Sequence, residues 1–184
     1  YTRDLDMRRS VLKRSFIAIM AQGEEYKITS SRFVSYKDPD LALVRYSITP
    51  LSCDAQITLI PFLNGDVKNE DSNYQEKFWD YISGQSSDDA SSITMRTKKT
   101  QFTVSSAFCC KLSHTHLKAR EAISENNGEL VGIRLDIKAE KGKALTLEKY
   151  IAVVSDRYEA AHTLEESARK KAAEAMQKGY DYLF

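Results

Sequence analysis

The chain has 184 residues, with 27 Lys or Arg against 26 Asp or Glu, so its formal net charge is +1. That length suits one domain with a real core, and a charge near zero argues against a nucleic-acid binder, which normally needs a cationic surplus. Hydrophobic residues make up 42% of the chain, and only seven Gly and three Pro occur, which excludes the disordered and collagen-like classes.

Apolar and polar residues alternate along most of the chain, as is typical of half-buried β-strands. Turn signals such as Asn64-Gly65-Asp66 separate the alternating stretches. The pattern predicts about eight strands, at residues 11–20, 25–36, 41–48, 55–63, 91–98, 101–112, 130–138 and 145–154. No helical pattern lies between them, so we expect antiparallel pairing in a β-sandwich or a barrel.

Two of these strands alternate most clearly. In residues 130–138 the side chains predicted to face the core are Val131, Ile133, Leu135 and Ile137. In residues 101–112 they are Phe102, Val104, Ser106, Phe108, Cys110 and Leu112. The opposite face of that strand, with Thr103, Ser105 and Lys111, is expected to be wetter.

Two stretches interrupt the strand pattern. Residues 67–90 are polar and are predicted to form a long excursion between strands, and an excursion of this length is either functional or mobile. Near the C-terminus, Asp156 and Glu159 resemble a capping box that starts a helix. An apolar stripe then recurs at helical spacing, through Ala160, Leu164, Ala168, Ala172, Ala175 and Met176. Gly179 is the predicted stop, and the small side chains suit close packing against a neighbour, including one outside this chain.

Three cysteines cannot form a disulfide framework, because Cys109 and Cys110 are adjacent and an odd count leaves one over. Since Cys110 falls on the core face, we expect reduced core thiols in a cytoplasmic protein. No apolar run approaches the ~20 residues that span a bilayer, and no signal segment opens the chain, which indicates a soluble protein. The first residue is Tyr1 rather than Met, which leads us to expect a piece of a longer protein.

The histidines offer a weak metal signal. His114 and His116 flank one residue and would share a face of a strand, a spacing used in two-His metal sites. No Cys or carboxylate stands at a supporting offset, so a polar hairpin end is favoured and no metal is predicted. Phosphate-binding and nucleophile motifs built on glycine are also missing from the sequence.

Carboxylates and aromatic rings gather in the long excursion. Glu70, Asp71, Glu76 and Asp80 lie close in sequence to Tyr74 and Trp79. Paired carboxylates with an aromatic platform are typical of sugar-processing sites. The alternative is a solvated acidic loop that its aromatic rings anchor to the sandwich, and from the residues alone this alternative is favoured.

Several ordered motifs resemble glycoside hydrolase family 65, which contains the maltose, trehalose and kojibiose phosphorylases. The strongest runs from Pro61-Phe62-Leu63-Asn64-Gly65-Asp66 into Phe78-Trp79 and looks most like the maltose phosphorylase branch. The other matching stretches are residues 5–16, 31–35, 39–42, 45–51, 97–102, 147–153 and 179–181. The resemblance covers nearly the whole chain.

The resemblance implies a fold and a place in a larger enzyme. It implies a mainly β, antiparallel sandwich in residues 1–155, lacking its first strands, and a linker helix in residues 156–184 that leads to an absent (α/α)6 catalytic barrel. The implied parent reaction is inverting phosphorolysis of an α-linked glucose disaccharide, with inorganic phosphate as co-substrate and no cofactor. Catalytic residues would lie in the barrel, so none is carried onto this chain.

We therefore expect a non-catalytic domain that supports the barrel, with a homodimer as a further partner. Asn69, Asp71, Tyr74 and Trp79 are the residues expected to border the sugar pocket of the barrel. Two alternatives remain, an independent carbohydrate-binding module and a self-contained hydrolase. Neither nucleic acid nor a membrane is an expected partner.

Overall fold

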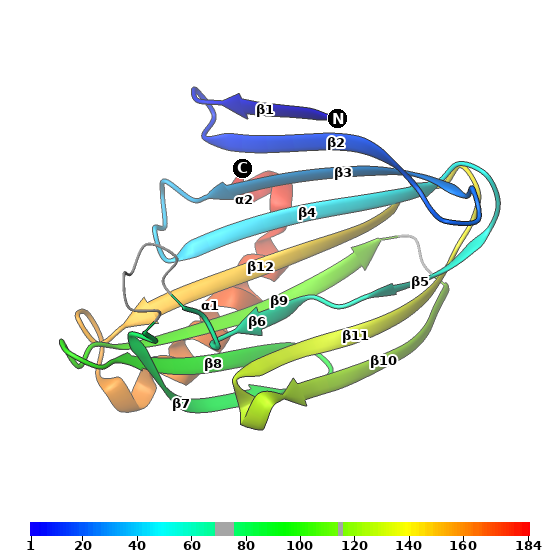
Figure 1. Ribbon diagram of the computed structural model, residues 1–184. Helices are drawn as coiled ribbons and strands as arrows, with labels where there is room; N and C mark the ends of the chain where they lie inside the picture. The colour runs from blue at the N-terminus through cyan, green and yellow to red at the C-terminus, as the bar shows by residue number, and fades with distance from the viewer. Residues whose placement is uncertain (69–75, 114–115) are drawn as a thin grey trace.

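A computed structural model describes residues 1–68, 76–113 and 116–184, with side chains from residue 119 onward in the last range. Within these residues the chain forms two antiparallel β-sheets and a C-terminal helical segment (Figure 1). The predicted mainly β, antiparallel sandwich with a C-terminal helix is therefore confirmed. Asn69, Asp71, Tyr74 and His114 lie outside the described residues.

The larger sheet has eight strands in the order β1-β2-β3-β4-β12-β9-β8-β7. Their bounds are β1 Thr2–Asp6, β2 Val11–Ile19, β3 Glu25–Val34, β4 Leu41–Pro50, β12 Leu145–Ser155, β9 Thr103–Ser113, β8 Ala90–Thr97 and β7 Trp79–Ser86. The chain runs up one half of the sheet as a meander and returns to its centre with β12.

The smaller sheet lies over the β12-β9-β8 part of the larger one (Figure 1). It contains β10 His116–Glu125, β11 Leu130–Ala139, β5 Ala55–Leu59 and β6 Phe62–Asn64. Both β5 and β6 pair with β11, and Pro61 separates them, since proline cannot donate to a strand ladder. The single strand predicted over residues 55–63 is therefore two strands.

The core between the sheets follows the predicted alternation of β11. Val131, Ile133, Leu135 and Ile137 are all at most 1% exposed, which confirms that face. Three of them pack with Phe108 of β9 and with other apolar side chains of both sheets. Burying such side chains is the main favourable term in sandwich formation, at about 25 cal/mol per Å² of apolar area.

Helix α1 (Leu164–Lys178) covers the other face of the larger sheet, and α2 (Tyr180–Leu183) follows it. Leu164, Ala168, Ala172 and Ala175 are the buried residues of α1, so the small-residue stripe packs on a sheet of this chain. Gly179 ends α1 at a φ of 84°, which confirms the predicted stop.

Helix α1 also corrects the prediction of one wet face on β9. Thr103 and Ser105 are 3% and 0% exposed, because α1 packs on that face while the smaller sheet packs on the other. Cys109 and Cys110 are consequently both buried, one toward each layer. Their predicted place in the core is confirmed.

The predicted helix start is wrong. The α-helix begins at Leu164, after a 3-10 turn at Ala161–Thr163, and Ala160 is exposed ahead of both. Asp156 instead accepts a 2.9 Å hydrogen bond from the backbone N–H of Thr103 and so ties the end of β12 to the start of β9.

The excursion predicted over residues 67–90 is wrong for its second half, where β7 lies. This strand is at the edge of the larger sheet and has a register shift between Tyr81 and Ser83, which breaks the alternation of its side chains. Strands β1 and β10 are also absent from the prediction. No helix among the described residues is long and apolar enough to cross a membrane.

Candidate functional site

The one described member of the predicted sugar-pocket rim is Trp79, the first residue of β7. Trp79 pairs with Thr97 of β8, and its half-buried ring packs on a small apolar cluster that contains Ile93, Met95 and Val131. Just before it, the carbonyl of Phe78 accepts a 2.9 Å hydrogen bond from the backbone N–H of Lys98. The ring is thus fixed by the sheet rather than by a loop.

Two grooves meet at Trp79. The first, of about 330 Å³, is mainly apolar and lies between the sheets, with Leu63, Val67 and Val153 among its lining residues. The second, of about 290 Å³, lies outside the sheet against the β8–β9 turn and is lined mostly by charged and hydroxyl-bearing residues, among them Glu76, Lys98 and Thr100. An indole ring that lines both grooves can pack its exposed face on a sugar ring while the neighbouring charged and hydroxyl groups reach the sugar hydroxyls.

An ion-pair cluster joins Lys77, in the first half of the excursion, to Asp66 just before it and to Glu129. The Nζ atom of Lys77 lies 2.6 Å from Oδ1 of Asp66 and 3.4 Å from Oε2 of Glu129. The hydrogen bond to Asp66 raises the pKa of Lys77. Residues 66 and 77 are therefore held together by an ion pair.

Gly65 lets the chain approach β8 closely beside this cluster. A Cβ atom at Gly65 would lie 2.7 Å from side-chain atoms of both Ile93 and Met95, closer than real Cβ contacts allow. The backbone N–H of Gly65 also donates a 2.7 Å hydrogen bond to the carbonyl of Glu129. The glycine of the predicted turn thus leaves room for the side chains of Ile93 and Met95, which would have to shift for any larger residue.

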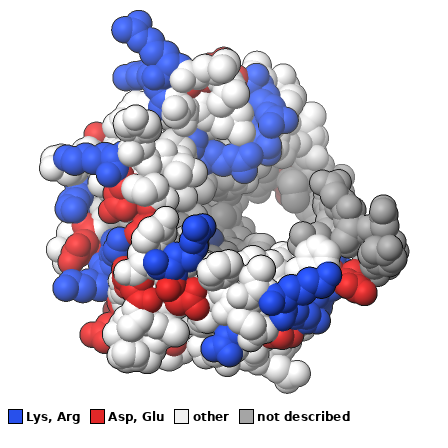
Figure 2. Space-filling view, turned by 90° about the vertical axis from the view of Figure 1, so that its left-hand side faces the viewer, with Lys and Arg blue, Asp and Glu red and all other residues white. Residues whose placement is uncertain are grey.

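The predicted carboxylate cluster is only partly described. Glu76 lines the groove against the β8–β9 turn, and Asp80 lies 3.8 Å from Nζ of Lys98. Glu70 and Asp71 lie outside the described residues. Seen from the left-hand side of Figure 1, the molecule has a hollow, with Lys and Arg side chains above and below it (Figure 2).

The other candidate residues from the sequence are the cysteines and the histidines. Burial raises the pKa of the Cys109 and Cys110 thiols, which makes both poor nucleophiles. His116 opens β10. Among the described residues, no three His, Cys, Asp or Glu side chains are grouped so that they could hold a metal ion.

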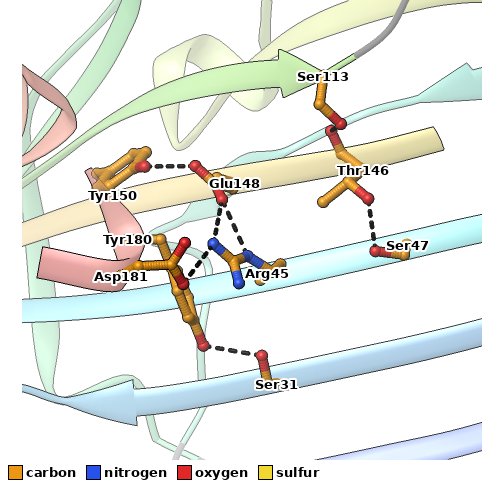
Figure 3. Close-up of polar contacts among 9 residues, drawn as sticks. All are labelled: Ser31, Arg45, Ser47, Ser113, Thr146, Glu148, Tyr150, Tyr180 and Asp181. Atoms are coloured by element: carbon orange, nitrogen blue, oxygen red, sulfur yellow. Dashed lines mark hydrogen bonds and ion pairs between the residues drawn. The ribbon is translucent and has the colours of Figure 1, made fainter. Parts of the chain in front are cut away.

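A second polar cluster was not predicted from the sequence and joins α2 to the sheet (Figure 3). Arg45 of β4 binds Glu148 of β12 through Nε at 2.9 Å and Nη2 at 2.7 Å, and it binds Asp181 at 3.0 Å. Its guanidinium carbon lies 3.9 Å from the centre of the Tyr180 ring. The Tyr180 hydroxyl lies 2.8 Å from Oγ of Ser31.

Tyr150 completes this cluster by donating a 2.5 Å hydrogen bond to Glu148. Burial raises the pKa of the Tyr150 hydroxyl, and the bond to Glu148 raises it further. The groups are paired with one another, so the arrangement holds α2 in place. Sequence reasoning missed it because Arg45 and Glu148 lie 103 residues apart and only the β4–β12 register makes them neighbours.

Comparison with known proteins points to one family. The whole chain, residues 1–184, matches the family model of the glycosyl hydrolase family 65 N-terminal domain. It is 29% identical to the maltose phosphorylase of Bacillus subtilis (strain 168) over 97% of this chain and 23% of that protein. It is 25% identical to the α,α-trehalose phosphorylase of Thermoanaerobacter brockii over 83% of this chain and 20% of that protein.

A solved structure shares the fold. It comes from the human microbiome and is assigned as a kojibiose phosphorylase, and it superimposes with a TM-score of 0.82 at 20% identity. The match covers 98% of this chain and 23% of the other. The chain thus spans between a fifth and a quarter of the length of each of these relatives.

Proposed function

The chain belongs to the glycosyl hydrolase family 65 N-terminal domain, and from this premise we propose that it is the non-catalytic β-sandwich of an inverting disaccharide phosphorylase. The observation that carries the proposal is coverage: two phosphorylases match nearly all or most of this chain with at most 23% of their own length. Most of each relative, with room for a separate catalytic domain, lies outside the matched region. The sandwich would support that domain through its C-terminal helices.

The proposed parent reaction converts an α-linked glucose disaccharide and phosphate into β-glucose 1-phosphate and a free sugar. One carboxylic acid would protonate the leaving oxygen, and phosphate, which is already an anion, would attack the anomeric carbon from the opposite face. The second carboxylate of an inverting hydrolase is then dispensable. Inorganic phosphate is the co-substrate that we propose, with no bound cofactor. The three free cysteines support a reducing compartment such as the cytoplasm, and a homodimer is a further proposal.

The test of this function uses the intact parent protein. It should release β-glucose 1-phosphate from at least one α-linked glucose disaccharide in phosphate buffer, followed by ¹H NMR of the anomeric proton. Residues 1–184 alone should release no sugar. Hydrolysis without phosphate incorporation, or turnover by residues 1–184 alone, would overturn the proposal.

We further propose that Trp79, with Asn69, Asp71 and Tyr74, borders the sugar pocket of the parent enzyme. The support is the position of Trp79 between two grooves, one of them lined mostly by charged and hydroxyl-bearing residues, where the sheet fixes its ring. Trp79→Ala and Tyr74→Ala should each lower kcat/KM for the disaccharide about ten-fold, a loss of about 1.4 kcal/mol in transition-state binding. Tyr158→Ala, at a tyrosine that is 84% exposed, is the matched control and should change nothing.

The position of Trp79 also favours a second candidate function, an independent carbohydrate-binding module. Calorimetric titration with maltose and longer α-glucans separates the two functions. Heat of binding to residues 1–184 that Trp79→Ala abolishes would support the module. If the titration gives no heat of binding and the intact Trp79→Ala enzyme has a lower kcat/KM, the result would favour the domain that supports the catalytic part.

A further inference from the structure

Helices α1 and α2 cover only part of their face of the larger sheet. Leu43, Tyr150 and Cys109 are buried beneath the helical segment together with Ala172 and Tyr180. Past Tyr180, in the direction away from α1, this face carries polar side chains instead. Two open grooves lie there, of about 440 and 410 Å³, and Arg45 lines both.

The first notable feature of this uncovered area is a row of hydroxyl side chains, which we name the hydroxyl ladder. Its six members come from six adjacent strands, and each is the direct cross-strand partner of the next: Thr2, Ser15, Thr29, Ser47, Thr146 and Ser113. At about 4.8 Å between strands, the ladder is about 24 Å long. Ser47 and Thr146 lie 2.7 Å apart, and Ser113 donates a 3.3 Å bond to the Thr146 carbonyl (Figure 3).

A charged row runs beside the hydroxyl ladder, two residues along each strand. It consists of Asp4, Lys13, Ser31, Arg45, Glu148 and Lys111, again as direct cross-strand partners. Arg45 and Glu148 neutralise each other at the centre of the row. Lys13 and Lys111, on either side of them, form no ion pair with any described residue, and neither does Asp4, the direct cross-strand partner of Lys13.

The two rows form a strip of small hydroxyl side chains with charged side chains along one border, among them two lysines without an ion pair. Long and aromatic side chains hold a neighbouring element away from a sheet, whereas serine and threonine are small enough to let another backbone approach closely. The same face already accepts a helix, because the buried positions of α1 are mostly alanine. The uncovered strip is therefore continuous with an established helix-on-sheet interface.

We propose that an α-helix from the catalytic part of the parent enzyme lies along the hydroxyl ladder, with small residues over the hydroxyls and acidic residues facing Lys13 and Lys111. This inference rests on the proposed function, which supplies the catalytic part. Charge complementarity selects the acidic residues, since the row has two lysines without an ion pair among the described residues against one such carboxylate, Asp4. The helix would continue the layer that α1 and α2 begin.

A sugar fits the strip less well than a helix. Sugar sites use an aromatic ring as a platform, and the described side chains that line the two grooves include none. The nearest ring of the cluster, that of Tyr180, has Arg45 over one face. A second copy of the chain is the other occupant to consider, and the experiment has to distinguish it from a helix of the catalytic part.

Thiol labelling of the intact parent protein tests whether the strip is covered. In a Cys53→Ser background, which removes the exposed thiol of residues 1–184, Thr29→Cys and Ser47→Cys are compared with Ser30→Cys. Ser30 is half-buried like Thr29 and Ser47 but lies on the opposite face of β3, so it provides the matched control. We expect maleimide to react at positions 29 and 47 at least about ten-fold more slowly than at position 30. Equal rates at the three positions would overturn the proposal.

Cross-linking of the unsubstituted protein identifies the occupant and needs no variant to fold. A zero-length carbodiimide reagent should join Lys13 or Lys111 to Asp or Glu residues of the catalytic part of the same chain. A mixture of ¹⁴N- and ¹⁵N-labelled protein separates links within a chain from links between copies. If links form only between copies, or if neither lysine forms a link, the proposed contact with a helix of the catalytic part is refuted.

The same samples are assayed for phosphorolysis, so the two proposals can fail separately. If the protein is an active phosphorylase but its strip is labelled quickly, the proposed function stands and the proposed helix contact is refuted. If the strip is protected and cross-linked but no phosphorolysis occurs, the helix contact stands and the proposed function is refuted.

Discussion

Lys149 is a charged side chain held between the two sheets. Its Nζ donates a 2.6 Å hydrogen bond to the carbonyl of Phe62 and lies 4.4 Å from the centre of the Phe108 ring. Burial lowers the pKa of this ammonium group from 10.5 to about 8, because the charge loses its hydration. The protonated form of Lys149 therefore opposes folding at neutral pH.

We expect the free energy of unfolding to rise with pH between about pH 8 and 10.5 on account of Lys149. In that window the folded chain has released the proton that the unfolded chain still binds, and stability rises wherever the unfolded state binds more protons. Lys149→Met should flatten this rise and stabilise the fold at pH 7 by about 1 kcal/mol. Urea unfolding across the pH range measures both effects.

Lys171→Met is the control with the opposite sign. Lys171 binds Asp40 at 2.5 Å, and this hydrogen bond raises the pKa of Lys171, so its loss should destabilise the fold. A pH slope in Lys149→Met equal to that of the unsubstituted chain would refute the role of Lys149.

At the scale of elements, α1 is fitted to the larger sheet by the smallness of its buried side chains. Ala168 and Ala172 are both 0% exposed, and α1 packs against β9, β12 and β8. Ala172→Leu adds three carbon atoms where no space is left, and overpacking of this kind costs about 1–3 kcal/mol. Thermal unfolding measures the loss as a lower Tm.

Glu174→Leu makes the comparison specific, since position 174 faces solvent on the same helix. Leucine is a good helix former at both positions, so helix propensity contributes little to the difference. The control should change the stability by no more than about 0.5 kcal/mol. Equal effects at positions 172 and 174 would mean that α1 is not packed as closely as the structure has it.

At the scale of the whole molecule, strand β9 joins the smaller sheet, the larger sheet and α1 into one unit. Phe108 is 0% exposed and packs toward the smaller sheet, while its neighbours Ala107 and Cys109 pack toward α1. Phe108→Ala should lower the free energy of unfolding by about 3–5 kcal/mol. Because β9 belongs to both interfaces, near-UV and far-UV circular dichroism should still report one shared transition.

Phe102→Ala is the matched control for Phe108. The prediction that Phe102 faces the core is wrong, because Phe102 precedes the strand and is 43% exposed. Its loss should be a fraction of the loss at Phe108. Separate transitions in Phe108→Ala for the sheets and for α1 would contradict the shared core.

The resemblance motifs and the alternation of residues together predicted the class of fold and much of the core. The inward face of β11, the burial of Cys110 and the stop at Gly179 each depend on a few neighbouring residues, and each was confirmed. Of the predicted pocket rim, Trp79 is the described member, and its role stays a prediction.

The tertiary structure alone decided what lies on the second face of each strand. Nothing near Thr103 or Ser105 indicates that a helix formed some 60 residues later will bury them. The Arg45–Glu148 pair and the hydroxyl ladder likewise depend on the register of strands that are far apart in the chain. Periodicity is a property of a short segment and shows which side chains share a face, whereas the element that covers that face is set by packing between distant segments.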